Sequence, residues 1–525
     1  MAVRLGDLRA VWGVALAAAA VRVALVWGLD LYADEAYYWT WSLRPATGYF
    51  DHPPMVAWLI AISSAVIPGE AGVRILFVAC GGLAVVFAAL VARELSDDRR
   101  APLGAALLAA AAPLLTLTGA LALPDAPVEA AYAASTWLLA RARGRRWLWA
   151  GVAVGLALLS KHTAALLAPA LLLLVAWDRE LRRELATPWP WAGAAVAVAV
   201  FLPNLWWNAT HGWVTIAFQL RHGFGGTPSW RTFLEYVGGQ LGGPGPVLLP
   251  LATWFLVRAS RSSADAGTPG AAGRPEAGAA AARPPSGPVP RADPSARVSA
   301  ARRVAVATLF PFAVTTLSAL RGPVEANWAA FAYPGLAGAA GAALSALRPG
   351  LARGLLAGSV ALGVAAASVF AYEVRHPTFA PVDSPLVARF RGWREFATRA
   401  RDAVDRACAS VGNPPGCDAA DPFVFTDGYQ EAAALAYYAG WRRFGRALAR
   451  PSQLDLWGAT PPPGSPFVTL AVGPVPDTSG WFRAEGRGPT RPFEVRLKGQ
   501  RMHRAEVTAY ERYLGPVPRA GHDLH

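Results

Sequence analysis

The segment Leu31–Trp58, LYADEAYYWTWSLRPATGYFDHPPMVAW, directly follows a long apolar run and is rich in polar groups. It places three carboxylates, one histidine and eight aromatic rings within 28 residues. The preceding apolar run, residues 10–29, is long enough to cross a bilayer. Ionisable groups are costly in hydrocarbon, so their position at the end of a span puts them near the lipid headgroups. The segment therefore predicts a polar site at one membrane face.

The composition of the whole chain is that of a polytopic α-helical membrane protein. Its 525 residues are 54% hydrophobic and only 16% charged. The formal charge is +14, and nearly all the basic residues are arginines, since Lys161 and Lys498 are the only lysines. Arginines gathered at the ends of apolar runs are expected from the positive-inside rule, without any nucleic-acid partner. The alternative is that the excess charge attracts anionic lipid or an anionic donor.

Apolar runs predict about eleven transmembrane helices. The first is expected to be an uncleaved signal-anchor helix. A shorter, proline-bounded run at residues 55–68 suits an interfacial or re-entrant helix better than a span. The predicted spans are residues 10–29, 71–92, 102–122, 126–141, 147–160, 163–177, 189–206, 236–257, 304–320, 329–347 and 354–372.

The loops between these spans predict the orientation of the chain. Basic segments all fall on one side, which is predicted to be cytoplasmic: Arg4 and Arg9, RELSDDRR (93–100), RARGRR (141–146), DRELRRE (178–184) and the region from Arg258 to Arg303. The polar segments around Asp34, Asp125 and Lys161, and residues 207–235 and 321–328, fall on the opposite side. That side is predicted to be periplasmic.

Four regions are predicted along the chain. Residues 1–258 form an N-terminal transmembrane catalytic region, and residues 304–372 form C-terminal transmembrane helices. Between them, residues 259–303 are rich in Ala, Pro, Gly and Arg and are predicted to be a disordered cytoplasmic linker. Residues 373–525 have a soluble composition and are predicted to be an α/β periplasmic domain. Within it, DPFVFTDGYQEAAALAYYAG predicts a strand, a loop and a helix, and PFVTLAVG predicts a strand.

Two of the three cysteines bracket a short loop, CASVGNPPGC. Cys408 and Cys417 would form a disulfide if this region lies in the oxidising periplasm. The alternative is two free thiols in a reducing compartment. Cys80 lies in an apolar run and is predicted to be a small core residue.

Several motifs together resemble the bacterial branch of the dolichyl-phosphate-mannose protein mannosyltransferases, glycosyltransferase family 39, whose relatives include the lipid A aminoarabinose transferases. In chain order they are DEAYYW, YFDHPPMVAW, LPDAPVEA, LLSKHTAALLAPAL, PNLWWNATHGWVTIAFQLRHG, GPVEANWAAFAYP, VFTDGYQEAAALAYYAG and PSQLDLWG. The resemblance implies a GT-C fold in the bacterial inner membrane. It also implies inverting transfer of a sugar from a polyprenyl-phosphate donor to a periplasmic acceptor, which could be lipid A, protein or another envelope glycan.

The positions of the acidic residues support an enzyme independently of this resemblance. Transporters place ionisable groups near the bilayer midplane, whereas here the carboxylates lie at span ends, where a lipid-linked phosphate would sit. Two alternatives remain: a flippase or transporter of lipid-linked sugars, and a non-catalytic envelope sensor that uses its C-terminal domain. A sensor would not need Asp34.

Asp34, Glu35 and Asp125 are the catalytic candidates. The resemblance implies that Asp34 is the general base that takes the acceptor proton, whereas the alternative is that it caps the helix that follows. Glu35 is expected to orient the acceptor or the loop. Asp125, in LPDAP, is expected to contact a sugar or, equally, to cap the next span.

Lys161, His52, Arg22 and Arg321 are the candidates for binding the donor phosphate. Lys161 is the only lysine among the first 497 residues and ends a span on the outer side. Its compact charge suits phosphate, and the alternative is a snorkelling membrane anchor. His52 follows Asp51 where the aminoarabinose transferases have a lysine, and it could bind phosphate when protonated. Arg22 lies inside the first span and Arg321 follows the ninth.

A divalent metal ion is the one cofactor considered. The resemblance implies Asp51 and His222 as metal ligands, with His52 as a further possible ligand. The alternative is that both histidines are hydrogen-bonded loop residues without a metal, because the sequence contains no closely spaced ligand motif. The expected partners are the lipid-linked donor, membrane lipid and the acceptor, with no nucleic acid.

Overall fold

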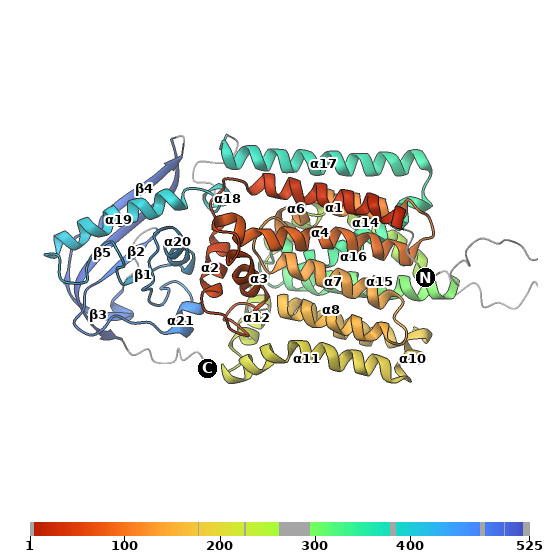
Figure 1. Ribbon diagram of the computed structural model, residues 1–525, viewed down its shortest axis with the longest axis horizontal. Coiled ribbons are helices and arrows are strands. Elements are labelled where there is room, and N and C mark those ends of the chain that lie inside the picture. Colours follow the sequence, from red (N-terminus) through yellow and green to blue (C-terminus); the bar gives the residue numbers. More distant parts are fainter. Residues whose placement is uncertain are drawn as a thin grey trace, which may run out of the picture.

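The computed structural model describes residues 5–517, apart from residues 177, 225–226, 262–293, 379–384, 473–477 and 498. A bundle of long, roughly aligned helices is joined at one end to a smaller domain that contains a sheet (Figure 1). This arrangement confirms the predicted fold class, a helical membrane protein with a C-terminal α/β domain.

Every predicted span overlaps a helix of the bundle. Within the described residues, six helices are long and apolar enough to cross a membrane, and several others are apolar but shorter. The total of eleven spans therefore stays a prediction. The helices of the bundle are α1 (Leu5–Val26), α4 (Gly69–Leu95), α5 (Ala101–Ala111), α6 (Pro113–Thr118), α7 (Asp125–Ala140), α8 (Arg146–Ser160), η1 (His162–Leu166), α9 (Leu167–Val175), α11 (Pro188–Thr210), α14 (Leu248–Arg261), α15 (Pro294–Ala319), η3 (Ala326–Ala332), α16 (Tyr333–Ala346) and α17 (Pro349–Arg375).

Proline and glycine divide two of the predicted spans into shorter helices. The span at residues 102–122 is broken before Pro113, whose ring cannot continue the helix of α5. The span at 236–257 becomes α13 (Trp230–Gly242) and α14, separated by a Gly/Pro-rich turn in which Gly245 has φ +82°. Apolar composition predicts burial in lipid, but the helix ends are decided by these breaker residues.

Most of the predicted linker, residues 262–293, lies outside the described residues. Its two edges are helical, because α14 extends to Arg261 and α15 begins at Pro294. The prediction of disorder was therefore too wide at both ends. Packing explains why residues 294–303 are helical. Ala300 and Ala301 are buried, and Arg303 forms a buried ion pair with Asp178 at 3.3 Å.

Small residues allow the helices of the bundle to approach closely. A Cβ atom added at Gly151 of α8 would lie 2.1 Å from the carbonyl oxygen of Gly193 on α11. At Gly341 of α16, an added Cβ would lie 2.6 Å from the backbone of Ala105 on α5. In lipid, the hydrophobic effect does not drive helices together. Close packing at small residues favours helix association instead.

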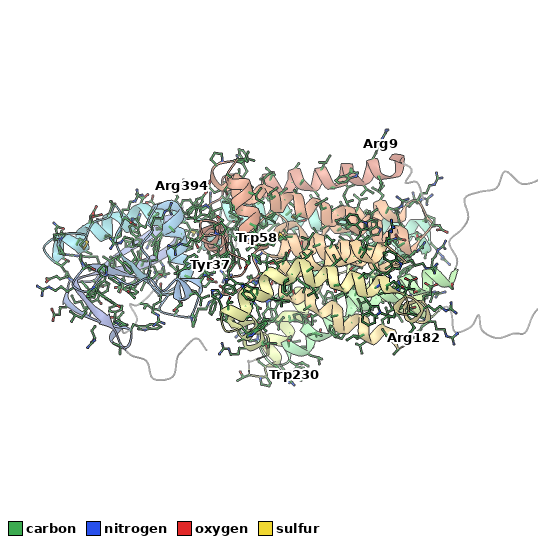
Figure 2. The ribbon with its side chains drawn as sticks, turned by 60° about the horizontal axis from the view of Figure 1, so that its bottom comes forward. Arg9, Tyr37, Trp58, Arg182, Trp230 and Arg394 are labelled. Atoms are coloured by element: carbon green, nitrogen blue, oxygen red, sulfur yellow. A yellow bond between two sulfur atoms is a disulfide. The ribbon has the colours of Figure 1, made fainter. Side chains whose placement is uncertain are left out.

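The two ends of the bundle differ in chemistry. Arg9 and Arg182 lie at the end far from the C-terminal domain, whereas Tyr37 and Trp58 lie at the junction with it (Figure 2). At the basic end, Asp178 caps α10 (Arg179–Leu185) by accepting hydrogen bonds from two backbone N–H groups. This segregation agrees with the predicted cytoplasmic position of the arginine-rich loops.

Short helices lie between the bundle and the C-terminal domain (Figure 1). They include α2 (Ala33–Ser42), α3 (Met55–Ser64) and α12 (Val214–Phe224). The α3 helix is the short helix predicted within residues 55–68, and α2 carries the DEAYYW motif. These helices bring the segment Leu31–Trp58 against the C-terminal domain.

The C-terminal domain packs helices against a five-stranded sheet of order β1-β2-β5-β3, with β4 paired to β5. Strands β1 and β2 are parallel, and the other pairs are antiparallel. The predicted strand, loop and helix correspond to β1 and α20, and the second predicted strand to β2. The elements are α18 (Pro385–Ala388), α19 (Trp393–Ser410), β1 (Val424–Thr426), α20 (Tyr429–Tyr438), α21 (Gln453–Trp457), β2 (Phe467–Ala471), η4 (Thr478–Gly480), β3 (Phe482–Arg487), β4 (Arg491–Leu497) and β5 (Gln500–Pro516).

Cys408 and Cys417 form a disulfide, as predicted. It joins the last turn of α19 to the loop before β1, and both cysteines are buried. Closing this short loop restricts the unfolded chain and so stabilises the domain.

Candidate active site

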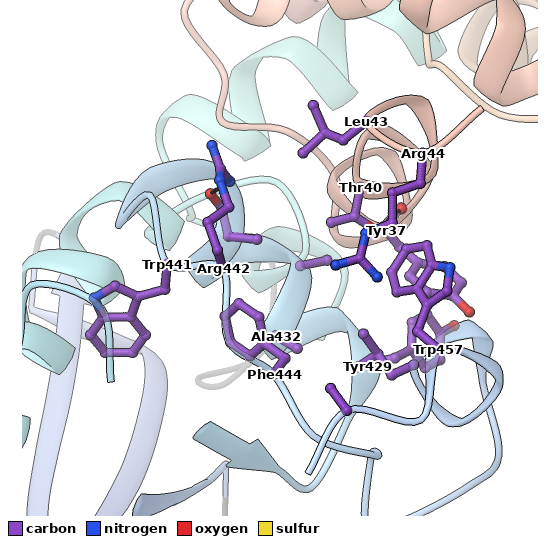
Figure 3. Close-up of a pocket in the computed structure, with 14 residues that line it drawn as sticks. Tyr37, Thr40, Leu43, Arg44, Tyr429, Ala432, Trp441, Arg442, Phe444 and Trp457 are labelled. Atoms are coloured by element: carbon purple, nitrogen blue, oxygen red, sulfur yellow. Dashed lines mark hydrogen bonds between the residues drawn. The ribbon is translucent and has the colours of Figure 1, made fainter. Parts of the chain in front are cut away.

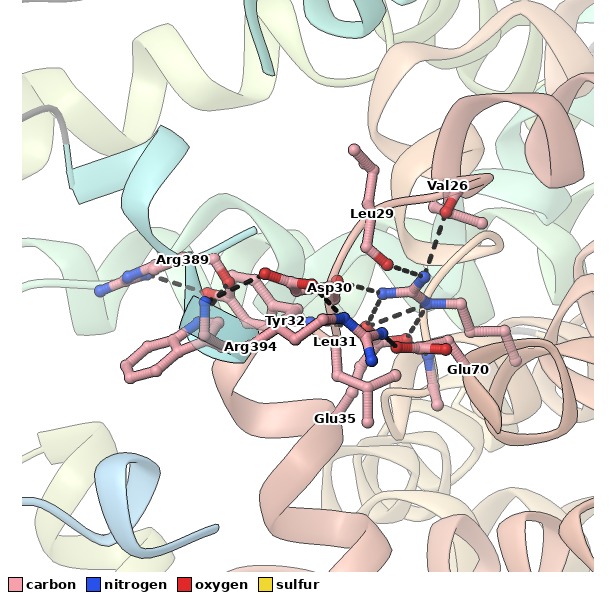
Figure 4. Close-up of polar contacts among 12 residues, drawn as sticks. Val26, Leu29, Asp30, Leu31, Tyr32, Glu35, Glu70, Arg389 and Arg394 are labelled. Carbon is pink, nitrogen blue, oxygen red and sulfur yellow. Dashed lines mark hydrogen bonds and ion pairs between the residues drawn. The ribbon is translucent and has the colours of Figure 1, made fainter. Parts of the chain in front are cut away.

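A buried ion pair fixes the start of α2. Glu35 is fully buried, and its carboxylate lies 2.6 Å from Nη2 of Arg74 on α4. It also accepts hydrogen bonds from the backbone N–H groups of Tyr32 and Ala122, each at 2.8 Å. Arg74 donates further to the carbonyl oxygens of Val26, Leu29 and Asp30 (Figure 4).

Both carboxylate oxygens of Glu35 are thus occupied by Arg74 and by backbone N–H groups. This environment fits the expected role of Glu35 in orienting the loop and gives no support to a chemical role. The same network connects α1, α2 and α4, and it therefore fixes the position of the neighbouring Asp34 relative to the helix bundle.

Asp34 is oriented by residues of the C-terminal domain. Its Oδ1 accepts hydrogen bonds from Tyr429 Oη at 3.2 Å and from Gln430 Nε2 at 3.0 Å. In the described part of the chain, Oδ2 has no hydrogen-bond partner, and no cation forms an ion pair with Asp34. The N-cap residue of α2 is Tyr32, so the alternative that Asp34 caps this helix was wrong. Asp34 is a positioned carboxylate with one oxygen open to accept a proton.

Asp51 is also held by the C-terminal domain. Its Oδ2 accepts a hydrogen bond from Tyr37 Oη at 2.8 Å, and its Oδ1 accepts one from Arg450 Nη1 at 3.1 Å. Burial raises the pKa of Asp51, while the charge of Arg450 acts in the opposite direction. Both oxygens of this buried carboxylate are therefore committed, in contrast to those of Asp34.

Lys161 and Asp125, predicted separately, form a buried ion pair. Lys161 Nζ lies 2.9 Å from Asp125 Oδ1, and the two side chains are only 10% and 6% exposed. Asn327 Nδ2 donates to the same oxygen at 3.3 Å. This burial excludes the snorkelling alternative for Lys161. Asp125 makes no capping hydrogen bond at the start of α7, so its capping alternative was wrong as well.

Acidic side chains lie near Tyr38 and basic side chains lie near His52, and the rings of these two residues are 5.9 Å apart. Burial, together with the negative charges of Asp34, Asp51 and Asp125, raises the pKa of the Tyr38 phenol well above its usual value. Burial lowers the pKa of His52 well below its usual value, and the charges of Lys161 and Arg450 act in the same direction. His52 is therefore neutral near pH 7 in the unliganded chain. His52 Nδ1 is buried without a hydrogen-bond partner among the described residues.

Ion pairs of Lys161 with Asp125 and of Arg450 with Asp51 lie near Tyr38 and His52, at the end of the bundle next to the C-terminal domain. A neutral His52 can donate one hydrogen bond, and an arriving anion would favour its protonation. These groups are suited to bind an anion beside Asp34, whose Oδ2 has no hydrogen-bond partner among the described residues.

A family model and a curated protein are similar to parts of this chain. The family described as Dolichyl-phosphate-mannose-protein mannosyltransferase matches residues 51–207. Lipid A galacturonosyltransferase RgtD from Rhizobium johnstonii is 28% identical over 253 residues, which are 45% of this chain and 51% of RgtD. The chain thus spans about half the length of this curated relative.

Solved structures decide the fold. ArnT from Cupriavidus metallidurans in the apo state matches with a TM-score of 0.60 at 16% identity, over 94% of this chain and 97% of ArnT. The same enzyme bound to undecaprenyl phosphate matches with a TM-score of 0.59 at 16% identity, over 97% of this chain and 98% of ArnT. The chain has the ArnT fold. The family model and RgtD agree with the motif resemblance to glycosyltransferase family 39, and the ArnT structures show that the fold is shared.

Three predicted residues lie apart from the central contacts of this ArnT-fold site. Arg22 is buried inside the bundle beside Gly81 and Gly119, and its Nη2 donates to the carbonyl oxygen of Leu115. Arg321 is exposed in the loop after α15, and His222 is exposed on α12. The His222 ring packs against Phe218 and Trp328.

The predicted metal site does not assemble. Among the described residues, no group of three or more His, Cys, Asp and Glu side chains is arranged to hold a metal ion. The carboxylate of Asp51 is occupied by Tyr37 and Arg450, and the exposed His222 ring contacts Phe218 and Trp328. The residues present do not fit the predicted ligand set, so no chemical step is assigned to a metal.

Sequence reasoning missed the residues that the C-terminal domain contributes. Tyr429, Gln430 and Arg450 contact Asp34 and Asp51 directly. The available signal was the VFTDGYQ motif, in which polar and aromatic side chains begin a helix. Its resemblance to family 39 indicated a shared domain but not a contact with the first outer loop.

Glu431 follows Gln430 on α20, and its buried carboxyl group leads us to expect that the stability of the folded chain depends on pH. Burial, assisted by the charge of Asp427, raises the pKa of Glu431 from 4.5 to about 7. Its Oε2 is buried without a hydrogen-bond partner among the described residues. Between pH 4.5 and about 7, Glu431 therefore holds a proton in the folded chain that it has lost in the unfolded chain. The free energy of unfolding falls as the pH rises through this range.

Glu431→Gln cannot ionise, so we expect it to raise the melting temperature at pH 8 and to change it much less at pH 5. Thermal unfolding of both proteins in one detergent at the two pH values measures the difference. Glu485→Gln, at an exposed position, is the control for a lost charge. An equal effect of Glu431→Gln at both pH values would contradict the raised pKa.

Proposed function

We propose that the chain is an inverting glycosyltransferase that moves a sugar from a polyprenyl-phosphate donor to an acceptor at the periplasmic face of the bacterial inner membrane. The observation that carries the proposal is the open oxygen of Asp34, in a site that also contains His52 and the ion pairs Lys161–Asp125 and Arg450–Asp51. A base and a phosphate site in one place are what this reaction requires. The name of RgtD, a lipid A galacturonosyltransferase, and the undecaprenyl phosphate bound in one ArnT structure support the same class of reaction.

In this mechanism, Asp34 Oδ2 accepts the proton of an acceptor hydroxyl. The acceptor oxygen then bonds to the anomeric carbon of the sugar from the face opposite the phosphate. The bond between that carbon and the phosphate oxygen breaks, and the polyprenyl phosphate leaves with the bonding electrons. Lys161 and His52 stabilise the charge that develops on the phosphate. Tyr429 and Gln430 keep the Asp34 carboxylate oriented during the transfer.

Transfer itself is the first test of the proposed function. Mass spectrometry of the envelope lipids and glycans of a deletion strain is expected to show one product lighter by a single sugar residue. Purified chain in nanodiscs, given the matching polyprenyl-phosphate sugar, is expected to restore that mass and release the polyprenyl phosphate. An unchanged envelope combined with no turnover of any candidate donor would contradict the proposal and favour a transporter or a sensor.

Lys161→Ala is expected to weaken binding of undecaprenyl phosphate about 10–100-fold, since a hydrogen bond to a charged group contributes about 1.5–3 kcal/mol. Lys161→Arg should restore affinity only in part, because the planar guanidinium is larger than the ammonium. Titration of the purified variants with undecaprenyl phosphate in detergent measures this effect.

Asp125→Asn is the matched control for the Lys161 variants. It removes the carboxylate partner but leaves the ammonium available, so affinity for undecaprenyl phosphate should not fall. If Lys161→Ala binds undecaprenyl phosphate as tightly as the unaltered chain does, Lys161 serves only to neutralise Asp125. The same conclusion follows if Asp125→Asn loses as much affinity as Lys161→Ala does.

A further inference from the structure

A cavity of about 340 Å³ lies between α2 and the C-terminal domain (Figure 3). Tyr37 and Tyr429 line it, and their hydroxyl groups bond Asp51 and Asp34, so this cavity is part of the candidate active site. A second cavity, of about 400 Å³, lies between α14 and α15 at the opposite end of the helix bundle. The mechanism proposed above makes no use of it.

This second cavity is an open groove where α14 ends and α15 packs against it. Arg302 Nε donates to the carbonyl oxygen of Ser260 at 3.1 Å, so the two helices meet there. The neighbouring Arg303 forms the buried ion pair with Asp178, the residue that caps α10 at the arginine-rich end of the bundle. The groove therefore lies at the end of the bundle that is predicted to be cytoplasmic.

The polar end of the groove is cationic. Arg261 and Arg302 line it, and no carboxylate is among the described residues of its lining. Ser260 Oγ is buried and has no hydrogen-bond partner in the described structure. An anion at this position would give the hydroxyl group an acceptor, and it would lie beside two guanidinium groups, which are well suited to phosphate oxygens.

The groove becomes apolar one helical turn further into the bundle. On α14, Leu256 and Val257 line it one turn before the polar residues. On α15, Ala305 and Val306 line it one turn after Arg302. Because α14 runs toward the arginine-rich end and α15 runs away from it, both steps lead in the same direction, about 5 Å toward the middle of the bundle. A phospholipid presents its headgroup and its acyl chains in this same order.

We propose that the groove binds one anionic phospholipid from the leaflet at the arginine-rich end of the bundle. Arg261 and Arg302 bind the phosphate group, Ser260 Oγ donates to one of its oxygens, and an acyl chain packs along the apolar part of the groove. A zwitterionic headgroup fits less well, because its ammonium group would lie beside two cations. A soluble anion would leave the apolar part of the groove in contact with water.

The bound lipid would connect α14 to α15, the two helices between which the chain leaves the bundle and returns to it. The inference does not depend on the proposed function, because it concerns a different end of the molecule and requires no sugar transfer. It therefore stands or falls on binding measurements alone.

Native mass spectrometry of the full-length chain in detergent measures the binding of single lipid molecules. The chain is titrated with phosphatidylglycerol, with phosphatidylcholine that has the same acyl chains, and with glycerol 3-phosphate as a soluble phosphate. We expect phosphatidylglycerol to bind about tenfold or more tightly than phosphatidylcholine. Glycerol 3-phosphate should not displace the lipid when the two are present at equal concentration.

Arg261→Gln/Arg302→Gln is expected to abolish the preference for phosphatidylglycerol. Arg261→Lys/Arg302→Lys should retain part of it, because the two charges remain while the planar guanidinium groups are lost. Arg99→Gln/Arg183→Gln is the matched control, because it removes the same charge from exposed positions in two other arginine-rich loops. This control variant should keep the full preference.

The proposal is overturned if the two phospholipids bind equally or if glycerol 3-phosphate displaces the lipid. It is also overturned if the control variant loses as much affinity as the groove variant, since the lipid would then respond only to the general charge of this face. Equal loss in the lysine and glutamine variants would show that the charges do not bind the lipid. If only a chain that lacks residues 264–290 prefers phosphatidylglycerol, those residues occupy the groove in place of a lipid.

Discussion

Asp34→Asn is expected to lower turnover by roughly 10²–10⁴-fold, the usual contribution of a general base. Asparagine has nearly the same shape as aspartate, and its carbonyl oxygen can still accept the hydrogen bonds of Tyr429 and Gln430. It cannot take a proton from the acceptor hydroxyl. Binding of undecaprenyl phosphate and the melting temperature should therefore change little.

The comparison that isolates this effect is Gln430→Ala, which removes one of the two contacts that orient Asp34 but leaves the base. We expect a smaller loss of turnover in Gln430→Ala than in Asp34→Asn. Initial rates, donor affinity and thermal unfolding are measured for both variants in the same detergent. Near-normal turnover in Asp34→Asn would remove Asp34 as the base and direct attention to Asp125, whose Oδ2 has no recorded hydrogen bond among the described residues.

Glu35→Ala is expected to destabilise the folded chain by about 3–5 kcal/mol, because it leaves a buried arginine without its carboxylate partner. Arg74 is 3% exposed, and its remaining contacts are carbonyl oxygens that cannot neutralise its charge. The variant should unfold at a clearly lower temperature or denaturant concentration. Glu395→Ala, which breaks an exposed pair with Arg399, should cost less than about 1 kcal/mol.

Replacing both partners distinguishes a structural Glu35 from a chemical one. Glu35→Met/Arg74→Met removes the two buried charges together, so it should be more stable than Glu35→Ala. If Glu35 only holds the loop, turnover should recover partly along with stability. A stable double variant with no measurable turnover would instead show that the carboxylate takes part in the reaction.

The helices of the bundle could be predicted because apolar runs of low charge directly reflect transfer into lipid. The strand and helix around VFTDGYQEAAALAYYAG could be predicted for a related reason, since local pattern and turn residues largely determine them. Pro113 and Gly245 show the limit of this signal, because apolar composition continues across the points where the helices end.

The pairing of site residues could not be predicted in the same way. Asp125 and Lys161 were each expected at an outer span end, but a sequence pattern does not tell which span ends are neighbours. The contact between Asp34 and Tyr429 depends on how the C-terminal domain docks on α2. Docking of this kind depends on the complementarity of two folded surfaces. This complementarity produces no periodic pattern in the sequence of either segment.

The contact between Asp34 and Tyr429 also has a consequence for biosynthesis. The two residues are 395 positions apart, so the ribosome adds the second about 20–80 s after the first, at about 5–20 residues per second. During this interval the first outer loop is already inserted, but its carboxylate lacks both of its C-terminal hydrogen-bond donors. In the proposed topology and mechanism, the site around Asp34 is therefore completed only after the C-terminal domain has crossed the membrane and folded. A chain truncated before α20 is then expected to insert into the membrane but not to act on the proposed donor lipid.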